Sequence, residues 1–96
     1  MFGIELLPLA EEELDEAEVW YALRSSTLGE DFHIEVDKQL ERIAHNPYLY
    51  GVVRRDIRRA PLRQFPHGIF FRVIKNMVVV VGVLHPSRRP SVLRDR

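Results

Sequence analysis

The spacing of apolar residues changes twice along this chain, from a period of two to a helical period and back again. Apolar residues alternate at the start, which predicts a short strand over Phe2–Leu7 that ends at Pro8. From Leu9 to about Ser25 they recur every three or four positions, which predicts a helix. The apolar stripe of this helix consists of Ala10, Leu14, Ala17 and Tyr21, widened by Trp20. We expect Trp20 and Tyr21 to anchor the helix in the core.

A second helix follows within a few residues. Thr27 and Glu30 have the spacing of a capping box, in which each side chain bonds the backbone N–H of the other, so the helix is predicted to begin there. Asn46 and Pro47 are predicted to end it, because asparagine tolerates a left-handed cap and proline cannot continue a helix. Its apolar face consists of Leu28, Phe32, Val36, Leu40 and Ile43. The short connection predicts an antiparallel helical hairpin.

After Gly51 the pattern becomes extended. Strands are predicted at Asp56–Leu62, Gly68–Ile74 and Met77–His85, with Lys75 and Asn76 as the turn between the last two. Residues 86–96, hereafter the tail, contain two prolines and four arginines and are predicted to be irregular. The order strand, two helices, three strands (β-α-α-β-β-β) predicts one α+β domain over residues 1–96, with the helical hairpin packed on one face of a small antiparallel sheet.

Both faces of the last two predicted strands are apolar. Ile69, Phe71 and Val73 alternate with Phe70, Arg72 and Ile74, and the run from Met77 to Leu84 has no polar face at all. Strands of this kind are normally buried on both sides, and two helices cover only one side. We therefore expect a partner or a second copy to cover the other face. The alternative is that the tail folds back over it.

Charge is segregated along the chain although it sums to zero. Residues 1–41 carry twelve of the fourteen acidic side chains and two basic ones, a net charge of −10, and residues 42–96 carry the reverse, a net charge of +10. Segregation of this kind favours an acidic partner or a polyanion. The alternative is that the two halves attract each other within one fold. Twelve of the fourteen basic residues are arginine, which suits bidentate contacts with phosphate or carboxylate.

Composition excludes several classes of site. The chain has no cysteine, so a disulfide framework, a thiolate nucleophile and a cysteine-based zinc site are all excluded. The four histidines lack metal-ligand spacing, and we expect neither a metal nor a cofactor. The start of the chain lacks the pattern of a signal peptide, and the longest apolar run is too short to cross a bilayer, so we expect a cytoplasmic protein without membrane contact.

The basic residues of the second half form the main candidate site. The cluster is Arg54, Arg55, Arg58, Arg59, Arg63, His67, Arg72, His85, Arg88 and Arg89. On alternating strands some of these side chains share a face, which predicts a basic groove edged by Tyr48, Tyr50 and Phe65. His67 or His85 is a candidate acid/base group for RNA cleavage, with Arg63 and Arg88 holding the phosphate. The alternative for each histidine is a hydrogen-bonding role at a strand end.

An ordered set of residues along the chain resembles the RelE/ParE superfamily of bacterial type II toxins, and its ParE-like, plasmid-stabilisation branch most of all. The first half of the set is Ala10, Leu14, Glu16, Ala17, Trp20, Tyr21, Leu28, Gly29, Phe32, Ile43, Asn46 and Pro47. The second half is Arg58, Arg59, Ala60, Leu62, Arg63, Gln64, Phe65, Pro66, Ile69, Phe71, Val73, Val79, Val83, His85, Arg88, Arg89 and Pro90. The resemblance implies a helical hairpin against an antiparallel sheet, which agrees with the fold predicted above.

The resemblance also implies partners. A cognate antitoxin would neutralise the toxin by lying over its sheet, against Phe70, Arg72, Ile74, Val78, Val80 and Leu84. Operator DNA would be bound only indirectly, through the antitoxin. ParE-like members are similar to inhibitors of DNA gyrase that perform no catalysis, and the anionic contacts would come from Arg58, Arg59, Arg63, Arg72, Arg88 and Arg89.

RelE-like members, in contrast, cleave mRNA in the ribosome. They typically use an arginine in the third-strand region, where this chain has Gly68, and often a tyrosine or histidine near the C-terminus. No tyrosine follows Tyr50 here, although His67, His85 and Arg88 remain available. Gyrase inhibition is therefore the leading interpretation. Ribosome-dependent mRNA cleavage and an inactive, antitoxin-binding homologue are the alternatives.

Overall fold

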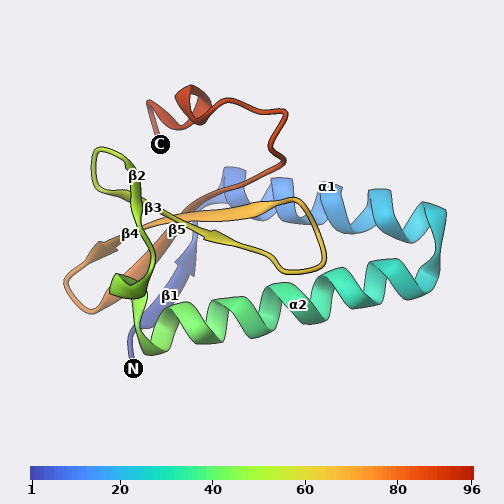
Figure 1. The fold of residues 1–96 in the computed structure, drawn as a ribbon, viewed down its shortest axis with the longest axis horizontal. Coiled ribbons are helices and arrows are strands. Elements are labelled where there is room, and N and C mark those ends of the chain that lie inside the picture. Colours follow the sequence, from blue (N-terminus) through green and yellow to red (C-terminus); the bar gives the residue numbers. More distant parts are fainter.

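The computed structural model describes residues 1–96 as two helices packed against a five-stranded sheet, with a C-terminal segment on the opposite side (Figure 1). The elements are β1 (Gly3–Leu6), α1 (Pro8–Arg24), α2 (Ser26–His45), a 3-10 turn (Pro47–Leu49), β2 (Val52–Arg54), β3 (Ile57–Pro61), β4 (Gly68–Ile74), β5 (Met77–Leu84) and a second 3-10 turn (Pro90–Leu93). The predicted α+β class, with a helical hairpin on one face of a sheet, is confirmed.

The sheet differs from the prediction in two details. Its strand order is β1-β5-β4-β3-β2, and β1 runs parallel to β5, so the sheet is mixed rather than antiparallel throughout. The crossover through both helices allows this parallel pairing. The strand β2, which the sequence did not predict, spans only three residues and pairs with β3 across a turn in which Arg55 has a φ of 52°. A three-residue strand is too short for alternation to be recognised.

Three predictions about the helices are wrong. The helix α2 begins at Ser26 and its N-cap residue Ser25 makes no side-chain hydrogen bond, so Thr27 and Glu30 lie inside the helix and form no capping box. Asn46 ends α2 with a φ of −153°, which is extended rather than left-handed. Trp20 is not a core anchor, because half of its surface is exposed and the guanidinium of Arg24 lies 3.1 Å from its ring centroid.

The face of the sheet toward the helices, here called the helix face, carries the larger core. Twelve buried residues form it, among them Phe32 and Ile43 from α2 and Phe71 and Val80 from the sheet. Tyr21 of α1 packs against this cluster as predicted. Two helices thus close one side of the sheet through interlocking large side chains.

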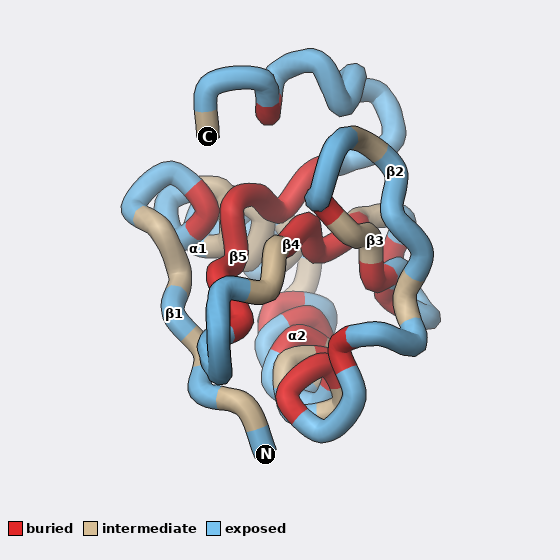
Figure 2. The backbone as a smooth tube through the Cα atoms, turned by 90° about the vertical axis from the view of Figure 1, so that its left-hand side faces the viewer, coloured by how far each residue is buried: buried red, intermediate tan, exposed pale blue.

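The opposite face, here called the tail face, is a second and smaller core made by Ile57, Phe70, Val79, Val81 and Leu84 and closed by Leu93 of the tail. The structure therefore has the alternative arrangement, in which the tail folds back over this face of the sheet. Figure 2 shows the tail as an exposed arm with one buried position, lying over the sheet.

A bulge in β5 decides which side chains reach the tail face. Phe70 pairs with Gly82 but Phe71 pairs with Val80, so Val81 has no partner in β4 and the alternation of β5 shifts there. Beyond the bulge, Leu84 therefore lies on the tail face. Val78 and Val80 lie before it, pair with Val73 and Phe71, and belong to the helix-side core with no exposed surface. Their predicted contact with an antitoxin is a wrong prediction, because α1 and α2 already cover them.

Candidate functional site

The tail docks onto the sheet through one apolar side chain. Leu93 is 1% exposed, whereas residues 85–92 before it are all exposed. Gly82 provides room for this contact, since a Cβ atom there would lie 2.8 Å from Leu93 Cδ2 and 3.0 Å from Arg96 Nη1. The missing side chain of Gly82 therefore lets the tail approach the sheet closely.

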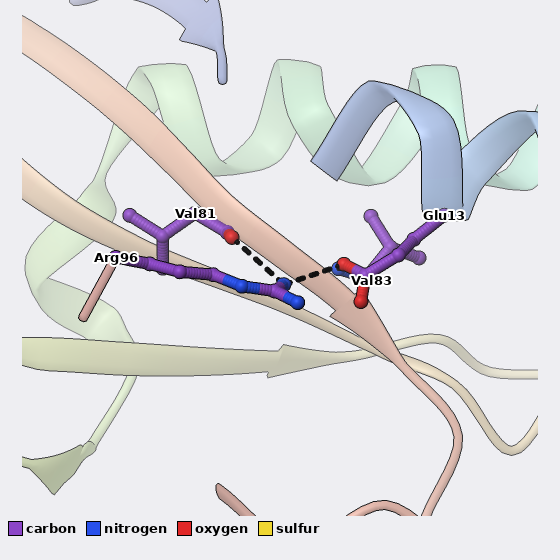
Figure 3. Close-up of polar contacts among 4 residues, drawn as sticks. All are labelled: Glu13, Val81, Val83 and Arg96. Carbon is purple, nitrogen blue, oxygen red and sulfur yellow. Dashed lines mark hydrogen bonds and ion pairs between the residues drawn. The ribbon is translucent and has the colours of Figure 1, made fainter. Parts of the chain in front are cut away.

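A partly buried ion pair holds the end of the tail (Figure 3). Arg96 Nη1 donates to Glu13 Oε1 at 2.8 Å and to the carbonyl oxygen of Val81 at 3.2 Å. The same Glu13 oxygen accepts the backbone N–H of Val83 at 3.1 Å. The side chains of Glu13 and Arg96 are only 14% and 12% exposed, so solvent screens their interaction weakly.

Arg72 completes the attachment from β4. Its Nη1 donates to the carbonyl oxygen of Arg96 at 3.1 Å, and its Nε lies 3.3 Å from the carboxylate of Asp56. The latter is an ion pair without a hydrogen bond, because the buried Nε–H has no aligned acceptor. Arg72 is thus partly committed to the tail and less open to an outside anion than the sequence suggested.

The predicted basic groove does not exist as one surface. Arg59 lies beside Phe70 on the tail face, with its guanidinium carbon 5.9 Å from the ring centroid. Arg58 points the other way, donates to the carbonyl of Tyr50 at 2.7 Å and lies 5.2 Å from the ring of Tyr48. Phe65 is a buried core residue and not a groove edge. Alternation along β3 separates neighbouring arginines onto opposite faces.

The remaining predicted arginines lie at two other places. Arg63 lines a surface hollow beside α2 with Lys38 and Arg42, where Glu35 accepts the backbone N–H groups of Arg63 and Gln64. Arg88 and Arg89 are exposed in the segment that joins β5 to the docked part of the tail. Only Glu13 and Arg96 form an ion pair between the acidic and the basic half of the chain, so the two halves do not neutralise each other.

A pocket of about 380 Å³ lies between α1 and the end of β5 and brings both candidate histidines together. Arg88 and Ser87 line it on one side, and Glu16, Trp20 and Tyr21 of α1 line it on the other. The rings of His67 and His85 are 5.4 Å apart between centroids and nearly perpendicular. The structure thus joins three of the four residues predicted for phosphate chemistry and leaves Arg63 elsewhere.

The two histidines of this pocket differ in burial and in hydrogen bonding. Burial lowers the pKa of His67 below its ordinary value of 6.5, with a further contribution from His85, and its buried Nδ1 has no hydrogen-bond partner. His85 Nδ1 accepts the backbone N–H of Ser87 at 3.0 Å, which assigns the proton of the neutral ring to Nε2. The pocket therefore offers a neutral imidazole and an N–H donor near an exposed guanidinium. Burial also raises the pKa of Tyr21.

Sequence reasoning missed Glu13, which stands among the acidic residues of α1 and was not one of the predicted site residues. Glu13 follows the buried Ala10 by three positions, a spacing that brings both residues to neighbouring parts of one helix face. That spacing is the only signal the sequence gives. No three histidine, aspartate or glutamate side chains lie together so as to hold a metal ion, and no helix is long and apolar enough to span a bilayer.

Comparisons with known proteins agree with this geometry. A family model described as the ParE toxin of the type II toxin–antitoxin system parDE matches residues 4–90. The fold is similar to a solved structure, the chromosomal ParDE TA system from P. aeruginosa, with a TM-score of 0.77 at 13% sequence identity, over 88% of this chain and 96% of that chain. A search of curated proteins found no match. Because the family model spans almost the whole chain, the protein belongs to the ParE toxin family of type II toxin–antitoxin systems.

Proposed function

We propose that this ParE-type toxin inhibits DNA gyrase by binding to it, without catalysis of its own, and that a cognate antitoxin neutralises it. The observation that carries the proposal is the ParE family match over residues 4–90. The exposed, unpaired Arg88 and Arg89 support a binding role, because guanidinium groups that no carboxylate neutralises are free to contact an anionic partner. A toxin with this target acts in the cytoplasm.

The proposed antitoxin surface is the tail face and its exposed margin. Phe70, Arg72 and Leu84 belong to this face or adjoin it, and Ile74 is about half exposed at the end of β4. Arg59 beside Phe70 adds a positive charge there. Recognition would combine apolar contacts with charge pairing. Operator DNA would be bound through the antitoxin.

The experiment is a supercoiling and DNA-cleavage assay with purified gyrase and antitoxin-free toxin. We expect loss of supercoiling together with trapped double-strand breaks. No effect at a large molar excess of toxin would contradict gyrase as the target.

Arg88 and Arg89 are the proposed gyrase contacts, and a double variant tests them. Arg88→Ala with Arg89→Ala should abolish inhibition and leave the fold intact, because both side chains are exposed. The matched control is Arg55→Asn with Lys75→Asn, which removes two charges from turns where both residues have a positive φ that asparagine tolerates. Retained inhibition in the first variant would remove these two residues from the interface.

A second candidate, mRNA cleavage in the ribosome, is supported by the convergence of His67, His85 and Arg88 on one pocket. In this mechanism the neutral His67 would accept a proton, the Nε2–H of His85 would donate one, and Arg88 would hold the scissile phosphate. Induction of the toxin would then produce codon-phased cuts that His85→Ala removes and the surface variant His45→Ala retains. Intact transcripts after induction would exclude this candidate.

A further inference from the structure

We propose that the tail face is a docking groove for a segment of a protein partner, and that residues 90–96 are an intramolecular ligand that fills it in the free protein. The segment it accepts carries an apolar side chain followed three positions later by arginine or lysine. The inference rests on the proposed function only in taking the antitoxin as the source of that segment.

The tail is attached in a way that permits exchange. Its backbone hydrogen bonds are local, from Arg88 to His85, from Val92 to Arg89, from Arg94 to Ser91 and from Arg96 to Leu93, and none joins a strand of the sheet. Contact with the rest of the protein comes from the side chains of Leu93 and Arg96 and from one carbonyl oxygen. Eight exposed residues, 85–92, separate these contacts from β5. The tail can therefore leave without breaking any strand pairing.

The groove fits one apolar side chain closely. Leu93 contacts a floor of Ile57, Phe70, Val79, Val81 and Leu84, and it is the only buried residue of the tail. Departure of the tail would expose this floor to water, which is unfavourable unless another apolar side chain replaces Leu93. The floor itself belongs to the sheet and does not depend on the tail for its strand pairing.

The charge of Glu13 determines which residue the docked segment must carry at the position that Arg96 now occupies. The Glu13 carboxylate is held in place by the N–H of Val83 and is almost buried, so removal of Arg96 would leave it without a cation. Water can hydrate Glu13 when the tail is away, but an occupant that covered Glu13 without a cation would leave the carboxylate desolvated and unpaired, which is strongly unfavourable. An occupant must therefore bring a cation to the same point. Arg72 also requires a backbone carbonyl from the occupant, as it now has from Arg96. A purely acidic segment would place like charges together and does not fit this end of the groove.

The test uses the full chain with the tail released by Leu93→Ser and Arg96→Gln. The probe is a fluorescently labelled synthetic peptide with the sequence of residues 86–96, followed by anisotropy. We expect saturable binding to the released variant and binding at least tenfold weaker to the unmodified protein, because the tethered tail competes at high effective concentration. Peptides that carry Leu93→Ser or Arg96→Gln should each bind at least tenfold more weakly. Adding Glu13→Gln to the released variant should have the same effect as the Arg96→Gln peptide.

Two outcomes would overturn the proposal. The first is absence of peptide binding to a released variant that circular dichroism shows to be folded, and if the double variant does not fold, Leu93→Ala alone serves as the host. The second is a concentration-dependent dimer of the unmodified protein that Leu93→Ser dissociates, which would assign the groove to the tail of a second copy. Gyrase does not enter this measurement, so failure of the gyrase proposal leaves its result unchanged.

Discussion

The two faces of one sheet are closed in different ways. On the helix face, two long helices and the sheet share a core of twelve buried residues, and on the tail face one residue of a short segment completes a cluster of six. The same strands contribute to both, so the difference lies in the covering layer and not in the sheet. The two helices lie between strands in the chain, so the helix face cannot be uncovered without unfolding. The tail is joined to the sheet at one end only, so the tail face can be uncovered while the strands stay paired. The exchangeable surface of this toxin is therefore the one that its tail covers.

Alanine substitution of two neighbouring phenylalanines on β4 should give the largest difference in stability between the two faces. Phe71 is fully buried on the helix face and Phe70 is 5% exposed on the tail face. We expect Phe71→Ala to lower the free energy of unfolding by about 3–5 kcal/mol, and Phe70→Ala by roughly half as much, because the tail can settle into the space that is left. Urea denaturation measures both. Equal losses would mean that the tail packs as firmly as the helices.

Alanine substitutions at Gly29 and Gly82 compare the packing between the helices with the packing beneath the tail, and their expected effects are smaller. A Cβ atom at Gly29 would lie 2.8 Å from the Cβ and 3.0 Å from the Cα of Ala22, so Gly29→Ala must push α1 and α2 apart. We expect a net cost of about 1–2 kcal/mol, since overpacking outweighs the gain in helix propensity.

At Gly82 the neighbours are the flexible ends of Leu93 and Arg96, so Gly82→Ala should displace the tail at little cost to global stability. Limited proteolysis within residues 85–92 should then become faster, with the thermal midpoint nearly unchanged. A large fall in thermal stability for Gly82→Ala would contradict a loosely held tail.

His67 gives a pH-dependent test at the end of the helix-side core, where its ring packs against Phe32 and Tyr21. Because burial lowers its pKa in the folded state, the unfolded chain binds the proton more readily as the pH falls below 6.5. The contribution of neutral His67 to the free energy of unfolding is therefore fully present above pH 6.5. It is lost as the pH falls toward the lowered pKa of the folded state. His67→Gln should flatten this part of the pH–stability profile, measured by urea denaturation at a series of pH values. An unchanged profile would mean that His67 titrates normally.

His33 should show the smallest effect and the opposite sign. The hydrogen bond to Glu18 raises the pKa of His33, with further contributions from the charges of Asp37 and Glu18. The contribution of protonated His33 to the free energy of unfolding is present below pH 6.5 and is lost as the pH rises through the raised pKa. Because the side chain is more than half exposed, solvent screens the pair, and His33→Gln should change stability only slightly. A change as large as that of His67→Gln would contradict this ranking.

Local pattern predicted much of the fold. The bounds of β4 and the turn at Lys75 and Asn76 agree with the structure, because glycine and a short polar pair flank clearly apolar runs. The bulge at Val81 could not be predicted, since an all-valine run gives no sign of where alternation shifts. The bulge places Leu84 on the tail face. Val78 and Val80 lie before it, and their regular pairing with Val73 and Phe71 across the turn at Lys75 and Asn76 puts them on the helix face.

The candidate site was less predictable than the fold. Alternation on β3 separates Arg58 from Arg59, and the loop after β3 carries Arg63 to α2, so a cluster in sequence became several separate positions in space. His67 and His85 are eighteen residues apart and meet only through the pairing of β4 with β5. Glu13 was hidden in a run of acidic residues, and only the position of the tail reveals its role.

Native-state hydrogen exchange, followed residue by residue at increasing urea concentrations, tests the difference between the two faces most directly. The amides of Arg94 and Arg96, bonded only within the tail, report on its opening, and the amides of the β4–β5 ladder report on global unfolding. We predict that the tail amides exchange through an opening of low free energy and weak urea dependence, while the ladder exchanges only through global unfolding. Tail amides with the same free energy and urea dependence as the ladder would show that both faces open together and would contradict an exchangeable tail face.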